Sequence, residues 1–145
     1  MVGSLLAMRP SPRQQQLARL RALAVGNGLR VRLIAARPMA PAKRQGVDYL
    51  LPWQVDDLAQ VRAQPFMALV NNAGQWLYRA TEEPLRDERM LLALGQLPAS
   101  VVELNASDEG LAARWDERGA ERDVERIAVS LGALREAWRV AVAKW

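Results

Sequence analysis

Apolar side chains recur every three or four residues along residues 12–25, which predicts an amphipathic helix there. Ser11 is followed by proline and then, three positions after the serine, by Gln14, which is the pattern of a capping box at a helix start. The segment Gly26-Asn27-Gly28 then predicts the end of the helix and a turn. The apolar positions of this helix are Leu17, Leu20, Leu23 and Ala24.

A longer helical pattern follows Gly119 and continues toward the C-terminus. Its apolar positions alternate steps of three and four, which predicts one stripe that packs on a sheet or on another helix. A shorter helix is predicted from Pro84 to about Leu94, and residues 54–64 are spaced for a short helix without a clear cap. The long stripe consists of Val124, Ile127, Leu131, Leu134, Trp138 and Ala141.

Strand patterns fill the regions between the helices. Residues 29–35 alternate apolar and polar positions, which predicts a strand with one buried face and an outer face partly lined by arginine. A short strand is predicted at residues 47–51. Residues 66–80 and 101–115 each contain two apolar runs around a turn rich in Asn, Asp, Ser or Gly, so each predicts a hairpin.

These elements predict an α+β fold, with a mostly antiparallel sheet of about six short strands, three or four helices and a long C-terminal helix. We expect residues 11–145 to form one domain. Residues 1–10 resemble either a tag remnant, because Val2-Gly3-Ser4 is typical of a cloning scar, or the flank of a truncated membrane anchor, because Leu5-Leu6-Ala7-Met8 runs directly into basic residues. A frayed native terminus is the alternative.

The composition excludes several classes of chemistry. The chain has neither cysteine nor histidine, so it has no disulfide, no thiolate nucleophile, no Ser-His-Asp triad and no His- or Cys-ligated zinc. The paired carboxylates Asp56-Asp57 and Glu82-Glu83 are the minimum for acid–base or magnesium chemistry. Adjacent side chains generally diverge, and Glu82-Glu83 before Pro84 fits the first turn of a helix better. We therefore predict no enzyme, no catalytic or metal-binding residue and no cofactor.

The charges are distributed very unevenly along the chain. Residues 1–47 contain nine of the 20 cations and no acid, whereas the remainder contains 11 cations and all 16 acids, a formal charge of −5. Such a block points to a polyanionic neighbour, namely an anionic membrane surface, nucleic acid or an acidic protein. The excess of arginine over lysine suits phosphate and carboxylate contacts, and a GC-rich genome would also produce it. The predicted contact residues are Arg9, Arg13, Arg19, Arg21, Arg30, Arg32, Lys43 and Arg44.

Three aromatic residues are candidates for a partner interface. Trp76 and Tyr78 share one face of a predicted strand, where they could stack on bases or, alternatively, pack in the core or an interface. Trp145, at the end of the sequence given, could be an exposed anchor.

The segment Leu5-Leu6-Ala7-Met8-Arg9-Pro10, the run Arg13-Gln14-Gln15-Gln16 and the helix that ends in glycine before Val31-Arg32 carry a family resemblance. Over residues 5–33 they resemble the stretch just after the membrane helix of YajC-like proteins, which are small single-pass bacterial inner-membrane proteins that accompany the preprotein translocase. The glycine-rich turn typical of that family's soluble domain is not matched here. The resemblance implies topology more than activity: an upstream anchor, a basic juxtamembrane segment and a domain on the cytoplasmic face of the inner membrane.

Three functions follow from these patterns. The first is a non-enzymatic interaction or scaffold domain, the cytoplasmic part of a membrane-anchored bacterial protein, with its basic third near anionic lipid and its acidic region and long helix on a protein partner. The second is an RNA- or DNA-binding module that uses the same arginines together with Trp76 and Tyr78. The third is an enzyme, which would require a deep pocket lined by convergent carboxylates and arginines.

Overall fold

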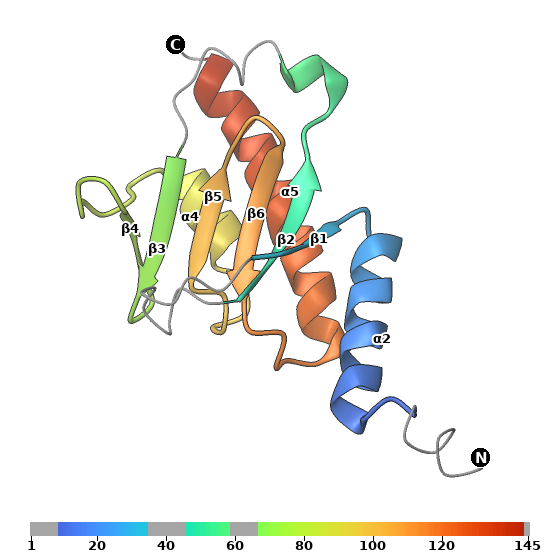
Figure 1. The fold of residues 1–145 in the computed structure, drawn as a ribbon. Coiled ribbons are helices and arrows are strands. Elements are labelled where there is room, and N and C mark those ends of the chain that lie inside the picture. Colours follow the sequence, from blue (N-terminus) through green and yellow to red (C-terminus); the bar gives the residue numbers. More distant parts are fainter. Residues whose placement is uncertain (1–8, 35–45, 59–66, 144–145) are drawn as a thin grey trace.

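The computed structural model describes residues 9–34, 46–58 and 67–143, and it confirms the predicted α+β class. Six antiparallel strands form one sheet in the order β1-β2-β6-β5-β3-β4. In the view of Figure 1, α4 and α5 lie behind this sheet, and α2 lies alongside α5 at the β1 edge. The elements are α2 (Pro12–Gly26), β1 (Arg30–Leu33), β2 (Val47–Pro52), the 3-10 turn η2 (Val55–Asp57), β3 (Met67–Asn72), β4 (Gln75–Tyr78), α4 (Glu88–Leu94), β5 (Glu103–Ala106), β6 (Gly110–Trp115) and α5 (Glu121–Ala143).

The first helix forms as the sequence predicts. Ser11 Oγ accepts the Gln14 backbone N–H at 3.1 Å, and the Gln14 side chain accepts the Ser11 backbone N–H at 2.9 Å, so the capping box is complete. At the other end Asn27 caps the helix, and Gly28 turns the chain with a φ of +83°.

The strand predicted at residues 29–35 is shorter than expected. Leu29 is buried and Val31 is half-buried, but Leu33 is 65% exposed, so the predicted buried face does not reach the end of the strand. Among the described residues β1 pairs only with β2, and an edge strand with one neighbour covers less of its apolar side.

The helix predicted from Pro84 begins later, and the helical role proposed for Glu82-Glu83 is wrong. Pro84 forms a β-bridge with Leu77, so this segment lies along the outer edge of β4, where a missing N–H is tolerated. The helix α4 begins after Asp87, whose carboxylate accepts the Met90 backbone N–H at 3.0 Å. Asp87 caps this helix, and the acidic residue of its first turn is Glu88 rather than Glu82 or Glu83.

Both predicted hairpins are confirmed, as β3–β4 and β5–β6. In the first turn the positive φ angles belong to Ala73 (+51°) and Gly74 (+90°) rather than to an asparagine. Asn71 contributes differently, because its side-chain oxygen accepts the Gly74 backbone N–H at 2.9 Å.

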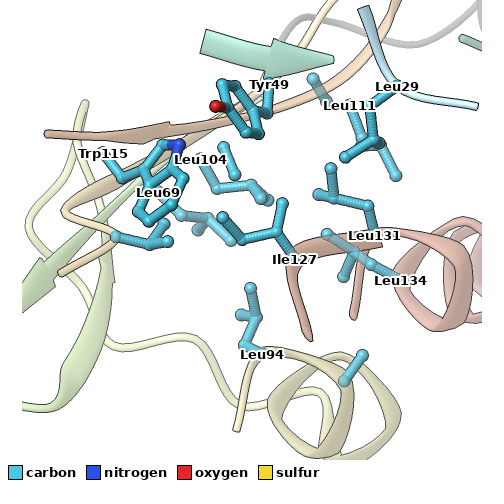
Figure 2. Packing of buried hydrophobic residues seen from close by; sticks show 14 of the residues in the cluster. Leu29, Tyr49, Leu69, Leu94, Leu104, Leu111, Trp115, Ile127, Leu131 and Leu134 are labelled. Carbon is cyan, nitrogen blue, oxygen red and sulfur yellow. The ribbon is translucent and has the colours of Figure 1, made fainter. Parts of the chain in front are cut away.

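The apolar stripe of α5 forms the centre of the core. Figure 2 shows Ile127, Leu131 and Leu134 beside leucines of the sheet, with Leu94 of α4 nearby. Each fully buried side chain of this kind stabilises the fold by roughly 1.5–3 kcal/mol. Trp138, at the end of the described stripe, is half-buried and packs against Trp53 with ring centroids 6.0 Å apart.

Candidate functional site

Three arginines of the basic N-terminal block are paired within the molecule. Arg21 of α2 donates from Nε and Nη2 to the two carboxylate oxygens of Glu117, at 2.9 and 2.8 Å. Arg13, two helical turns earlier, donates to the backbone carbonyls of Glu117 and Asp116 at 2.9 and 3.3 Å. Arg32 of β1 forms an exposed ion pair with Glu109. Part of the charge segregation in the sequence therefore serves to dock α2 and β1 on the rest of the domain.

Glu117 is the centre of the first of these contacts. It is 2% exposed, adopts a φ of +58° and also accepts the hydroxyl hydrogen of Tyr49 at 2.9 Å. The Tyr49 ring in turn packs edge-on against Trp115 at a centroid distance of 5.2 Å. The pKa of Tyr49 is raised far above its ordinary value. Burial is the largest cause, and the hydrogen bond to Glu117 and the negative charge of Glu117 add to it. Tyr49 is therefore a neutral hydrogen-bond donor over the physiological range.

Three other predicted contact residues have no partner for their charge among the described residues. Arg9, Arg19 and Arg30 are exposed, and within the described segments none of them makes an ion pair or a side-chain hydrogen bond. Arg9 precedes α2, Arg19 lies on it, and Arg30 begins β1, which α2 contacts, so all three belong to the α2–β1 end of the molecule (Figure 1). We call these three residues the basic edge. Lys43 and Arg44 lie outside the described residues.

A second charged cluster crosses the sheet on the face opposite to the core. The strand register places Asp48, Arg114 and Glu103 side by side on β2, β6 and β5. Arg114 donates to Asp48 at 3.0 Å and to Glu103 at 3.3 Å, and Arg79 reaches Glu103 from beyond the end of β4 at 2.5 Å. The two carboxylate side chains are only 8% and 2% exposed. Charges buried to this degree require such partners.

A pocket of about 510 Å³ opens beside this cluster. Its lining combines Arg79, Glu82 and Glu103 with apolar and amide groups of β3, β4 and the start of β5; the other lining residues are Val70, Asn71, Asn72, Leu77, Tyr78 and Val102. Glu103 is not free for acid–base chemistry, because one of its oxygens is hydrogen-bonded by Arg79 and the other by Arg114. Glu82 is the second carboxylate of the lining, and its side chain is exposed.

The carboxylate pair Asp56-Asp57 is divided by the fold. Asp56 is exposed, whereas Asp57 is 5% exposed and accepts hydrogen bonds from Arg139 of α5 at 2.5 and 3.0 Å. Gln54 joins this contact, because its side chain accepts from Arg139 and its backbone N–H donates to Asp57 at 3.1 Å. Within the described residues, no group of three or more carboxylates converges as a metal site would require. Asp57 thus joins η2 to the long helix.

Asp57 gives the fold a defined acid sensitivity. The hydrogen bonds from Arg139 lower its pKa against the opposing effect of burial. A carboxylate with a depressed pKa stabilises the fold above its unfolded pKa of about 4 and loses that contribution as the pH falls through the folded value. We expect Asp57→Asn to be less stable than the wild type at pH 7, and the difference to shrink in urea titrations performed at successively lower pH. Asp56→Asn is the matched control and should have little effect at any pH; a difference for Asp57→Asn that stays constant with pH would contradict the assignment.

Trp76 and Tyr78 lie apart from the basic edge. Trp76 is 7% exposed and belongs to the core, so the packing interpretation fits it and a base-stacking platform with Tyr78 does not form. Tyr78 is half-buried on β4, and the strand order places β4 at the opposite edge of the sheet from β1. The pKa of Tyr78 is raised mainly by burial, and the negative charge of Asp87 adds to this effect. Trp145 lies outside the described residues.

Comparisons with protein-family models, with curated proteins and with solved structures found no match. The resemblance to YajC-like proteins over residues 5–33 therefore stays a prediction. Among the helices of the described residues, none is both long and apolar enough to cross a membrane.

Sequence reasoning missed the acidic residues that organise these clusters, namely Asp48, Glu103 and Glu117. A signal was present for Glu103, because it interrupts an apolar run between Val102 and Leu104 and a strand charge in that position requires a partner. Glu117 gave no such signal, since it lies between two other charged residues, Asp116 and Arg118, in the loop between β6 and α5.

Proposed function

We propose that this chain is a non-enzymatic interaction domain, the cytoplasmic part of a small membrane-anchored bacterial protein, whose basic edge lies on the anionic surface of the inner membrane. The observation that carries the proposal is that Arg9, Arg19 and Arg30 remain exposed and uncompensated at one end of the molecule, although the domain contains carboxylates that pair with other arginines of the same block.

The internal pairs decide which cations are available to a surface. Arg21 is held by both oxygens of a buried carboxylate, and Arg13 by two backbone carbonyls, so moving either onto a lipid headgroup would break contacts of the fold. The three residues of the basic edge have no such contacts among the described residues. Each could contribute up to about 1 kcal/mol of attraction to an anionic leaflet. A basic segment next to an anchor would add to that anchor's hold on the membrane without any new apolar contact.

The scaffold part of the proposal concerns the exposed side of α5. Val129 is 59% exposed there, and Glu121, Arg122, Glu125 and Arg126 are exposed on the same helix. A protein partner with a partly apolar surface that carries charges of both signs would fit this side, while the basic edge faces lipid at the α2–β1 end.

Nucleic-acid binding is the second candidate, and the structure narrows the form it would take. The aromatic platform is lost because Trp76 is buried, so among the described residues of the N-terminal block the basic edge remains to contact phosphates. Binding of that kind is independent of sequence and weakens steeply with salt.

The test is sedimentation of the protein with vesicles that contain anionic phosphatidylglycerol, compared with neutral phosphatidylcholine vesicles. We expect the triple variant Arg9→Glu, Arg19→Glu, Arg30→Glu to bind the anionic vesicles up to roughly a hundredfold more weakly, because up to ~3 kcal/mol of attraction is removed. Arg13 and Arg21 stay unchanged, because replacing them would disturb the fold, and a loss of vesicle binding could then result from unfolding.

The matched control is Arg86→Glu, Arg89→Glu, Arg126→Glu, which alters the net charge equally at exposed sites elsewhere. This control should keep most of the vesicle binding. Equal losses in both variants would mean that net charge alone acts and would remove the basic edge as a site. Absence of wild-type binding to anionic vesicles, together with salt-dependent binding to an oligonucleotide, would favour the second candidate.

A further inference from the structure

We propose that the pocket beside the Arg79–Glu103 ion pair binds a small carboxylate ligand with an apolar body, with Arg79 as the group that receives the carboxylate. This site is separate from the basic edge, because β3, β4 and β5 lie at the other side of the sheet from β1.

The argument begins with the hydrogen-bonding capacity of Arg79. A guanidinium has five N–H donors, and among the described residues Arg79 uses only Nη1, on Oε1 of Glu103. The side chain is 47% exposed, so its remaining donors face the pocket and solvent. A planar carboxylate matches these donors in a bidentate contact, whereas a neutral group matches them less well.

Glu103 is not expected to contact the ligand directly. It is 1% exposed, and its two oxygens are hydrogen-bonded by two different arginines. Its charge is therefore compensated from within, and it serves to orient the Arg79 guanidinium. This preorganisation lowers the conformational entropy that Arg79 would lose on binding.

The backbone around Arg79 is fixed as well. The Arg79 N–H donates to the Ala68 carbonyl at 3.0 Å, and the Tyr78 N–H donates to the Glu83 carbonyl at 2.8 Å. The Glu82 N–H closes the turn on the Tyr78 carbonyl at 2.7 Å, and Glu82 adopts a φ of +60°. The rim of the pocket is thus a hydrogen-bonded turn that holds Arg79 and Glu82 in place.

The remaining lining determines the body of the ligand. The strand register places Val70 of β3 opposite Leu77 of β4, and Val70 also opposite Glu103 of β5, so two apolar side chains lie next to the ion pair. The volume of about 510 Å³ is within the range of small-molecule sites, roughly 300–1,000 Å³. An aromatic or branched aliphatic body fits this wall. Glu82 also lines the pocket, and its charge disfavours ligands with more than one negative group.

Titration of the domain with phenylacetate at millimolar concentration, followed by backbone amide chemical shifts in NMR, tests the proposal. We expect saturable shifts at Val70, Leu77 and Arg79, and weaker binding of the uncharged isostere phenylacetamide. Arg79→Gln should weaken phenylacetate binding at least about tenfold, because a charged hydrogen bond is lost. Glu82→Gln should strengthen it, because a like charge is removed from the rim.

Arg86→Gln is the matched control, since Arg86 is exposed and does not line the pocket, and it should bind phenylacetate as the wild type does. Thermal unfolding of each variant checks that the fold is retained. The proposal is overturned if acid and amide bind equally, if Arg79→Gln binds like the wild type, or if the shifted amides lie away from β3 and β4. It is also overturned if phenylacetate produces no shifts up to the limit of its solubility. None of these outcomes depends on the vesicle experiment.

Discussion

Replacing Glu117 by glutamine is expected to lower the free energy of unfolding by about 3 kcal/mol, although the two side chains have nearly the same shape. The carboxylate is buried and accepts hydrogen bonds from Arg21 and from the Tyr49 hydroxyl. Glutamine has one oxygen and one NH2 group, so at least one of these donors would face another donor in a dry environment. Arg21 is about one-third exposed, which keeps the expected loss at the lower end for a buried ion pair. Urea unfolding followed by tryptophan fluorescence measures the change.

Two further variants separate the ion pair from its surroundings. Glu125→Gln makes the same chemical change at an exposed site of α5, and we expect it to stay within about 0.5 kcal/mol of the wild type. Arg21→Met removes the other partner, so the double variant gives the coupling energy between Arg21 and Glu117. A coupling energy near zero, or a Glu117→Gln protein as stable as the wild type, would show that the Arg21–Glu117 ion pair does not contribute to the docking of α2.

This pair also changes how the basic block should be interpreted. From the sequence, a segment of 47 residues without an acid indicated an external polyanion. In the structure, two arginines of the block instead pair with carboxylates of the same molecule: Arg21 pairs with Glu117, and Arg32 pairs with Glu109. The partners are 96 and 77 positions away along the chain, and a one-dimensional charge pattern contains no information about which distant residues meet. Among the described cations of the block, Arg9, Arg19 and Arg30 are the ones that remain available to an external polyanion.

The sequence was most informative where local chemistry decides the structure. The capping box at Ser11, the two hairpins and the stripe of α5 from Val124 to Leu134 depend on neighbours within a few positions, and each is confirmed. The start of α4 was wrong because Pro84 is equally suited to the first turn of a helix and to a sheet edge. Tertiary pairing with Leu77 selects the edge, and no local pattern distinguishes the two.

The candidate sites depended almost entirely on tertiary placement. Arg79 and Glu103 are 24 positions apart, and they meet because β5 pairs with β3 rather than with β4. Trp76 and Tyr78 were correctly placed on one strand, but their burial is determined by the layer of helices behind the sheet. The alternation along a strand shows which residues share a face of the sheet, but it does not show which of the two faces the helices cover.

Replacing Gly110 by alanine is expected to destabilise the domain by about 3 kcal/mol or more, because the added methyl group would meet backbone rather than a flexible side chain. A Cβ at this position would lie 2.1 Å from the Leu51 carbonyl oxygen and 2.9 Å from the Pro52 Cα. Gly110 begins β6 opposite Pro52, in the middle of the sheet, so relief would require β2 and β6 to separate. That shift would also strain the Trp53 indole, which donates to the Ser107 carbonyl at 2.6 Å in the adjoining turn.

Gly132→Ala is the natural counterpart, and the opposite sign is expected there. Gly132 lies inside α5, and a Cβ built on it has no atom of another part of the described molecule within 4 Å. Alanine reduces the backbone entropy of the unfolded chain, so this variant should gain about 0.5–1 kcal/mol. Urea unfolding of both glycine variants compares one chemical change in two environments. A Gly110→Ala protein with wild-type stability would contradict the close β2–β6 contact at Pro52, and amide hydrogen exchange would show whether the two strands separate there.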